Sequence, residues 1–235
     1  MRLDKYICDN TSLTRSLATK AIKSGRIKVN GIKPKSGSLK ILPDTDQVLF
    51  DGHLVEVQPL TRYFMMNKPQ GYVCANSDGE HALVFDLMSD EINVSKLHTV
   101  GRLDKDTTGL LLITDDGQWS HQITSPKHHQ AKIYRAWLAE PLIKEAEQKL
   151  ETGIVLKDEI KPTLPANLKR ISDTEVLLTI NEGRYHQVKR MFAALGNRVI
   201  RLHRESIGEI QLDPLLAPSE YRMLTLQEVQ SLSKT

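Results

Sequence analysis

The chain has 235 residues, enough for one large domain or two smaller ones. It has no apolar run near the roughly 18 residues that a membrane span requires and no hydrophobic signal core at its N-terminus, so we expect a cytoplasmic protein with no membrane contact. The net charge of +3 is uneven: residues 1–40 contain ten Lys or Arg and two Asp, a local charge of +8, which leaves −5 for the rest and indicates that the N-terminal segment binds a polyanion.

The N-terminal segment has the pattern of a small module of helix and strand. Residues 14–24 place apolar side chains at helical spacing after the hydroxyl of Thr14, and Gly25 follows as a C-terminal stop, which predicts a helix. The run RIKVNGIKP then alternates basic and apolar residues as far as Asn30-Gly31, a dipeptide typical of a tight hairpin turn. Both elements would present basic side chains to solvent.

These runs, with RLDKYI near the start and DQVLFDG at residues 46–52, resemble the S4 type of RNA-binding domain, which we place at residues 1–57. The resemblance implies docking on structured RNA, where Lys and Arg neutralise phosphates. A solvated basic face without a ligand is the alternative that charge alone leaves open. The side chains of this domain expected to contact RNA are Arg2, Arg15, Lys20, Lys23, Arg26 and Lys28.

A second domain is expected at residues 63–235, after a linker at residues 58–62 that contains a proline. Strands are predicted at residues 63–66, 72–75, 109–114, 132–138, 175–180 and 199–204. Helices are predicted at residues 117–124, 142–151, 185–195 and 225–232, the last with a Thr225–Glu228 capping box. Because strands and helices do not alternate strictly, we predict an α+β fold with a mixed, largely antiparallel sheet.

Several chemistries lack the residues that they need. No two glycines form a GxG pair and no GxxxxGK[ST] motif occurs, so sites for dinucleotides, methyl donors and nucleoside triphosphates have no phosphate cradle. Cys8 and Cys74 lie far apart, the eight histidines show no HExxH pattern, and no GxSxG motif is present. We therefore expect neither a cofactor nor a metal ion.

The segment GRLDKDTTGLLLITDDG, residues 101–117, places Asp104 and Asp106 directly before an apolar strand. Glycines that free the backbone and leucines that anchor it suit a carboxylate held rigidly beside a cleft, although an ordinary charged turn fits the residues equally well. The segment resembles the signature of the RsuA-type pseudouridine synthases. Further runs resemble that family in the same order: NKPQGY (67–72), DDGQWSHQITSPKHH (115–129), KIY (132–134) and EGRYHQVKRMFAALGN (182–197).

The resemblance implies the roles of site residues. It makes Asp104 the catalytic carboxylate, with Asp106 its exposed neighbour, and it makes Tyr134 the aromatic side chain that packs on the uracil and assists proton removal at C5. One carboxylate could act by attacking C1′ of the ribose, by attacking C6 of the uracil or by stabilising a glycal route. The sequence does not distinguish these three mechanisms. Tyr134 fits a core position of a strand equally well on its residue pattern alone.

The family also pairs a basic residue after the GRYHQ run with the aspartate, and two neighbours compete for this role. Apolar side chains at 188, 191, 192 and 195 form one helical stripe, which Lys189 borders and Arg190 opposes. We therefore predict that Lys189 is the partner of Asp104. Arg102, His186 and Arg190 are expected to contact RNA.

The resemblance further implies that the substrate is uridine 516 of 16S rRNA, in the free RNA or in a small-subunit assembly intermediate. We expect the protein to be a monomer. Relatives that act on 23S rRNA or tRNA provide an alternative target. Two alternatives come from other functional classes: a non-enzymatic S4 protein of ribosome assembly and an S4-containing RNA methyltransferase. The missing GxG pattern argues against the methyltransferase.

Overall fold

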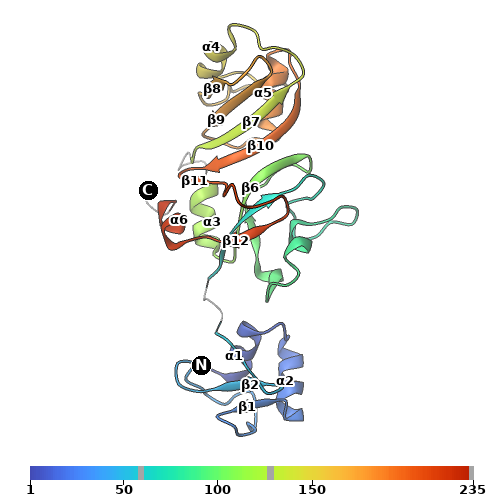
Figure 1. The fold of residues 1–235 in the computed structure, drawn as a ribbon, viewed down its shortest axis with the longest axis vertical. Helices are drawn as coiled ribbons and strands as arrows, with labels where there is room; N and C mark the ends of the chain where they lie inside the picture. The colour runs from blue at the N-terminus through green and yellow to red at the C-terminus, as the bar shows by residue number, and fades with distance from the viewer. Residues whose placement is uncertain (58–60, 126–129, 233–235) are drawn as a thin grey trace. The chain divides into compact units, whose positions relative to one another are not determined.

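The computed structural model describes residues 1–57, 61–125 and 130–232. The chain divides into two compact units, one formed by Met1–Leu60 with Met88–Lys96 and the other by Thr61–Leu87 with Leu97–Thr235 (Figure 1). The domain boundaries expected at residues 57 and 63 remain a prediction, and residues 58–60 of the expected linker lie outside the described residues. Within the described ranges, no helix has the length and hydrophobicity that a membrane crossing requires.

The first unit packs two helices against a small antiparallel sheet. The helices are α1 (Leu3–Asn10) and α2 (Arg15–Ser24), and the strands are β1 (Ile27–Val29), β2 (Val48–Phe50) and β3 (His53–Leu54), in the order β1-β2-β3. The helix expected at residues 14–24 is confirmed as α2. Thr14 accepts a hydrogen bond from the backbone N–H of Leu17, and Gly25 ends the helix with a left-handed φ of 82°.

The turn predicted at Asn30-Gly31 is also confirmed. However, the strand before the turn pairs mainly with a strand much further along the sequence, not with the residues directly after the turn. Asn30 and Gly31 have φ values of 51° and 79°, as a tight hairpin turn requires, and Val29 pairs with Ile32 across them. The main partner of β1 is β2, which lies well beyond the turn in the sequence: Lys28 lies opposite Leu49. The turn therefore reverses the chain without setting the whole sheet.

The second unit is built on a nine-stranded sheet. Its strands are β4 (Tyr63–Lys68), β5 (His98–Val100), β6 (Thr107–Thr114), β7 (Lys132–Leu138), β8 (Asn167–Arg170), β9 (Glu175–Ile180), β10 (Val199–Ile207), β11 (Ile210–Gln211) and β12 (Tyr221–Met223). The order is β12-β4-β6-β10-β7-β9-β8, with β5 paired to β6 and β11 to β10 (Figure 1). Every pairing is antiparallel except β6 with β10, so the predicted α+β fold with a largely antiparallel sheet is confirmed.

Helices pack on this sheet where their apolar faces can be buried. They are α3 (Gly117–Thr124), α4 (Ala146–Glu151), α5 (Gln187–Ala194) and α6 (Leu226–Ser231). Short 3₁₀ helices form at Val84–Met88 and, within the first unit, at Val94–Lys96. Trp119 and Ile123 of α3 share a buried cluster with Met65, Leu110 and Leu112 of the sheet. The capping box at the start of α6 is confirmed.

Three element predictions need correction. The strand expected at residues 72–75 is wrong: only Val73 makes a bridge, to Leu83, because the carboxylate of Asp78 accepts hydrogen bonds from the N–H groups of Glu80 and His81 and turns the chain. The helix expected from residue 142 starts at Ala146, since the N–H of Leu142 instead bonds to the carbonyl of Asp173. The helix expected from residue 185 starts at Gln187, after a left-handed His186.

Candidate active site

A cleft of about 770 Å³ opens in the second unit. Its walls come from stretches that are far apart in the sequence: the loop before β6, the first half of β7, residues 180–189 and the second half of β10. Asp104, Tyr134 and Lys189 all line it. The three residues that the sequence analysis predicts to form the active site therefore line the same cavity.

Lys189 forms ion pairs with two carboxylates at the edge of this cleft. Its Nζ lies 3.0 Å from Oδ2 of Asp104 and 2.5 Å from Oδ1 of Asp106. Burial opposes the charge on Lys189, but the hydrogen bonds to Asp106 and Asp104 outweigh it and raise the pKa of the lysine. Burial likewise opposes the charge on Asp106, and the hydrogen bond from Lys189 outweighs it and lowers the pKa of that carboxyl. Asp106 is exposed, as expected, yet it shares the cation of Asp104.

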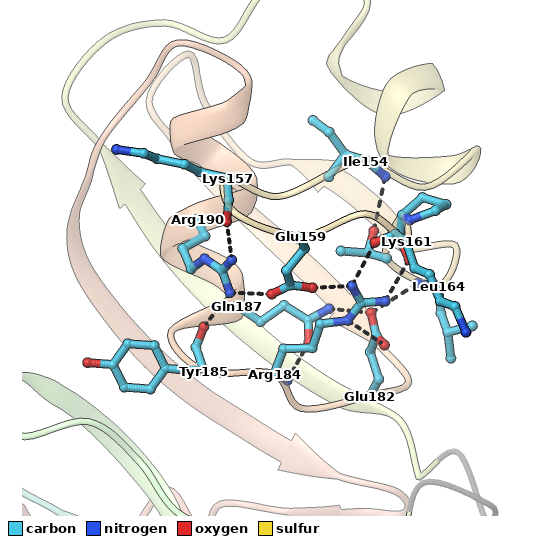
Figure 2. Close-up of polar contacts among 12 residues, drawn as sticks. Ile154, Lys157, Glu159, Lys161, Leu164, Glu182, Arg184, Tyr185, Gln187 and Arg190 are labelled. Atoms are coloured by element: carbon cyan, nitrogen blue, oxygen red, sulfur yellow. Dashed lines mark hydrogen bonds and ion pairs between the residues drawn. The ribbon is translucent and has the colours of Figure 1, made fainter.

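Arg190, the competing candidate, pairs with Glu159 in a cluster of polar side chains (Figure 2) and forms no ion pair with Asp104. Its Nη1 lies 2.6 Å from Oε1 of Glu159, and its Nη2 donates to the carbonyl oxygen of Lys157 at 2.6 Å. Arg184 binds the other oxygen of Glu159 through its Nη1 at 2.5 Å. One carboxylate therefore ties the loop at residues 157–162 to both ends of the segment that carries Lys189. The expected contact of Arg190 with RNA remains a prediction.

His186 is held in a strained conformation beside the same carboxylate. Its φ is 46°, a left-handed value that residues other than glycine adopt uncommonly, and its Nε2 lies 3.4 Å from Oδ1 of Asp104. The ring of Tyr185 stacks on the imidazole, with the ring centres 3.8 Å apart, and is 72% exposed. An RNA contact is predicted for His186. Its imidazole also lies close enough to Asp104 to interact with that carboxylate.

A buried lysine fixes the backbone that carries Asp104. Lys68, the last residue of β4, is fully buried, and its Nζ donates to the carbonyl oxygens of Asp104 at 3.1 Å, Thr107 at 2.9 Å and Pro69 at 3.0 Å. Burial lowers the pKa of this ammonium group. Lys68 belongs to the NKPQGY run, but the sequence analysis predicted no function for it. A lysine ending an otherwise apolar strand was the available signal.

Tyr134 lies in the cleft wall on β7, directly opposite Arg204 of β10. The guanidinium of Arg204 donates through Nη1 to the hydroxyl oxygen of Tyr134 at 3.3 Å and through Nε to the carbonyl oxygen of Leu110 at 2.8 Å. Both side chains are largely buried, at 8% and 2% exposure. Sequence reasoning missed Arg204, because its contact with Tyr134 depends on the register between two strands that are distant in the sequence.

Gly109 allows this part of the sheet to close. Its φ is 102°, and a Cβ atom there would overlap the carbonyl oxygen of Arg204 and lie 2.8 Å from its nitrogen. The parallel pairing of β6 with β10 places Gly109 opposite Arg204. Only glycine permits this approach, so the GLLLIT run supplies the close contact as well as the apolar strand.

The side chains predicted to contact RNA fall into three groups. Within the described part of the chain, Arg15, Lys20, Lys23 and Lys28 are exposed and form no ion pair. Arg2 pairs with Asp4 and Arg26 with Asp51. Arg102 lines the cleft, is exposed and has no carboxylate partner among the described residues.

No group of three His, Cys, Asp or Glu side chains in the described ranges is arranged to hold a metal ion. The cleft instead offers a carboxylate beside a lysine, with a tyrosine hydroxyl in its wall. Such a set can supply a nucleophile or an electrostatic partner and can move a proton.

The chain matches the family model described as RNA pseudouridylate synthase over residues 62–194, and the S4 domain model over residues 1–46. It therefore belongs to the RNA pseudouridylate synthase family, a class of isomerases, and carries an S4 RNA-binding domain at its N-terminus. Membership of this family argues against a non-enzymatic S4 protein and against a methyltransferase.

Curated relatives make the similarity more specific. The chain is 54% identical to the ribosomal small subunit pseudouridine synthase A of Vibrio cholerae over 234 residues, which cover 100% of both chains. It is 50% identical to the protein of the same name from Escherichia coli, over 99% of this chain and 100% of that one. A crystal structure of a pseudouridylate synthase matches with a TM-score of 0.71 and 50% identity, over 99% of both chains.

Proposed function

We propose that the protein converts uridine 516 of 16S rRNA to pseudouridine and that Asp104 is its catalytic carboxylate. The observation that carries the proposal is the meeting of Asp104, Lys189 and Tyr134 at one cleft in a chain whose full-length relatives are named for the ribosomal small subunit. The proposed substrate places the protein in the cytoplasm. Free 16S rRNA and a small-subunit assembly intermediate are both compatible with the site.

The geometry supports a division of labour among the residues. Lys68 holds the backbone of Asp104, and the ammonium group of Lys189 donates a hydrogen bond to its carboxylate. The uridine must leave its helix to reach the cleft, at a cost of a few kcal/mol, and Tyr134 offers a flat surface to receive it. We assign to the hydroxyl of Tyr134 the task of helping to remove the proton at C5.

The exposed basic side chains of the S4 domain supply binding energy from phosphates and not the choice of uridine. Arg102 and the Tyr185–His186 stack border the cleft, and we assign them to the RNA that flanks the target nucleotide. Exposed aromatic rings of this kind are suited to stacking on unpaired bases.

The experiment that tests the proposal compares wild type with Asp104→Asn on full-length 16S rRNA and maps pseudouridine at every position. We expect one modified site, at uridine 516, with wild type and none with the variant. Glu151→Gln, which removes an exposed carboxylate at the end of α4, is the matched control and should keep full activity. Equal modification by wild type and Asp104→Asn contradicts the catalytic assignment, and modification only of 23S rRNA or tRNA contradicts the substrate.

A further inference from the structure

A lysine of β7 that lines the cleft has no part in the mechanism above. Lys132, the first residue of β7, lines the same cleft as Asp104 and Tyr134. It stands two residues before Tyr134 on the strand, so the two side chains project from the same face of the sheet. β10 runs beside them and places Arg204 opposite Tyr134.

Lys132 and Arg204 line this cleft without a carboxylate partner among the described residues; the fully buried Lys68 also has none, but it donates to backbone carbonyl oxygens. The Nζ of Lys132 donates to the carbonyl oxygen of Gln130 at 2.6 Å, and no Asp or Glu of the described residues forms an ion pair with it or with Arg204. Arg204 is only 2% exposed, and its Nη2 has no hydrogen-bond partner within the described structure. Lys189, in contrast, has two carboxylates.

Cations without a counter-ion in a cleft lower the stability of the protein unless a negatively charged group of a ligand binds beside them. Buried charges are normally paired or hydrogen-bonded. Burial, together with the charge of Arg204, lowers the pKa of Lys132 to about 8, so the lysine still carries its proton at neutral pH. The cleft therefore holds a positive charge that the protein itself leaves without a counter-ion.

The isomerisation produces a negative charge of the matching kind. When the N1–C1′ bond breaks, its electron pair remains on the uracil and spreads over N1 and the carbonyl oxygens. C1′ either forms an ester bond to the carboxylate, which leaves when C5 bonds to C1′, or becomes part of a glycal, for which C2′ loses a proton and regains it when C5 bonds to C1′. C5 then gives an electron pair to C1′, the C5 proton leaves and N1 gains a proton, so atoms and electrons balance. Attack of the carboxylate at C6 likewise places negative charge on the ring. Every route passes through an anionic base.

We propose that Lys132 is a catalytic residue that donates a hydrogen bond to a carbonyl oxygen of the uracil and stabilises the negative charge on the detached base. Arg204 is a positioning residue: its Nη1 occupies one acceptor position of the Tyr134 hydroxyl oxygen and thereby directs the proton of that hydroxyl away from the guanidinium. The inference rests on the proposed function, since it takes the uracil of the substrate as the occupant of the cleft.

The test separates binding from chemistry in the full-length enzyme. Dissociation constants and single-turnover rate constants on 16S rRNA are measured for wild type, Lys132→Met, Lys132→Ala and the control Lys169→Met, which removes an exposed lysine from β8 of the same sheet. We expect Lys132→Met to lower the rate constant on the order of 100-fold while the dissociation constant changes less than about threefold. Propylammonium, which replaces the atoms missing in Lys132→Ala, should restore the rate, and 1-propanol of similar size should not.

Two results overturn the inference: a rate constant for Lys132→Met within about twofold of wild type, or a loss confined to RNA affinity, which marks Lys132 as a phosphate contact. Failure of propylammonium to restore a Lys132→Ala enzyme that keeps wild-type thermal stability also counts against it. The proposed function is judged separately by Asp104→Asn. If that variant is inactive while Lys132→Met is fully active, only the role of Lys132 fails.

Discussion

The ammonium group of Lys189 lies 3.0 Å from a carboxylate oxygen of Asp104 and is shared with Asp106 at 2.5 Å. Two carboxylates thus share one lysine at the edge of the cleft, and Asp104 also has the imidazole of His186 at 3.4 Å. Removing the lysine takes away the shared cation, including the hydrogen bond that lowers the pKa of Asp106.

We therefore expect Lys189→Met to lower the single-turnover rate constant by about 10²-fold, since an uncompensated charge at a reacting centre costs a few kcal/mol. Lys189→Arg keeps the charge and should retain most of the activity. Rate constants for both variants, with Lys169→Met as the control, check this. Equal rates for Lys189→Met and wild type would mean that the ion pair has no part in the reaction.

Glu159 is expected to act at a distance through the two arginines that it binds. Glu159→Gln weakens both ion pairs, and because each is partly exposed we expect only a small loss in the free energy of unfolding. Amide hydrogen exchange should rise in residues 182–190, the segment that carries His186 and Lys189. Urea denaturation and exchange measurements test this against Glu151→Gln. Unchanged exchange in that segment would show that the cluster does not hold it.

The three residues of the proposed active site could be named from the sequence, but the residues that support them could not. Asp104, Tyr134 and Lys189 stand in local runs whose resemblance to a family carries their roles, and the helical stripe alone favours Lys189 over Arg190. Lys68, Glu159 and Arg204 act through partners that are many residues away, and those contacts depend on strand register and loop path. Such tertiary contacts leave no periodic pattern in the sequence.

The same limit applies to the fold. Long apolar strands such as β6 and β7 and capped helices such as α3 and α6 have strong local signals, and their predicted ranges agree closely with the structure. The edge strands β8 and β12 were missed because they are short and contain no buried residue, so they show no alternation of buried and exposed positions. The segment at residues 72–75 has strand-like composition but finds only a single bridge.

Gly109 should not tolerate a side chain. In Gly109→Ala the new Cβ would overlap the backbone of Arg204 at a φ of 102°, so β6 and β10 must separate. We expect a loss of about 3 kcal/mol or more in the free energy of unfolding, from the combined strain and overlap. Gly117→Ala is the matched control, because a Cβ there meets no atom within 4 Å. Thermal unfolding of the two variants tests this prediction. Similar melting temperatures would contradict the close approach of Gly109 to the backbone of Arg204.

The salt dependence of RNA binding should report the exposed lysines of α2. Lys20→Gln with Lys23→Gln removes two cations that have no ion-pair partner in the described structure. If both contact phosphates, the slope of log K against log salt concentration should become shallower by about 2. Binding of 16S rRNA at several salt concentrations measures the slope. Lys144→Gln with Lys169→Gln, which replaces two exposed lysines of the second unit, is the control, and an equal change in both double variants would remove the special role of α2.

The lowered pKa of Lys132 has a consequence for stability that can be measured without RNA. Its pKa is about 8 in the folded protein, against 10.5 for an ordinary lysine. Between these values the unfolded chain binds more protons than the folded chain, so the contribution of Lys132 to stability rises with pH through this window and is least favourable below pH 8. Relative to Lys132→Met, which cannot titrate, wild type should gain on the order of 1–3 kcal/mol between about pH 7.5 and 10.5. Denaturation of both proteins across this range tests the sign. A difference that stays constant with pH would show that burial does not hold the lysine pKa down, and a difference that falls with pH would indicate an unseen stabilising partner.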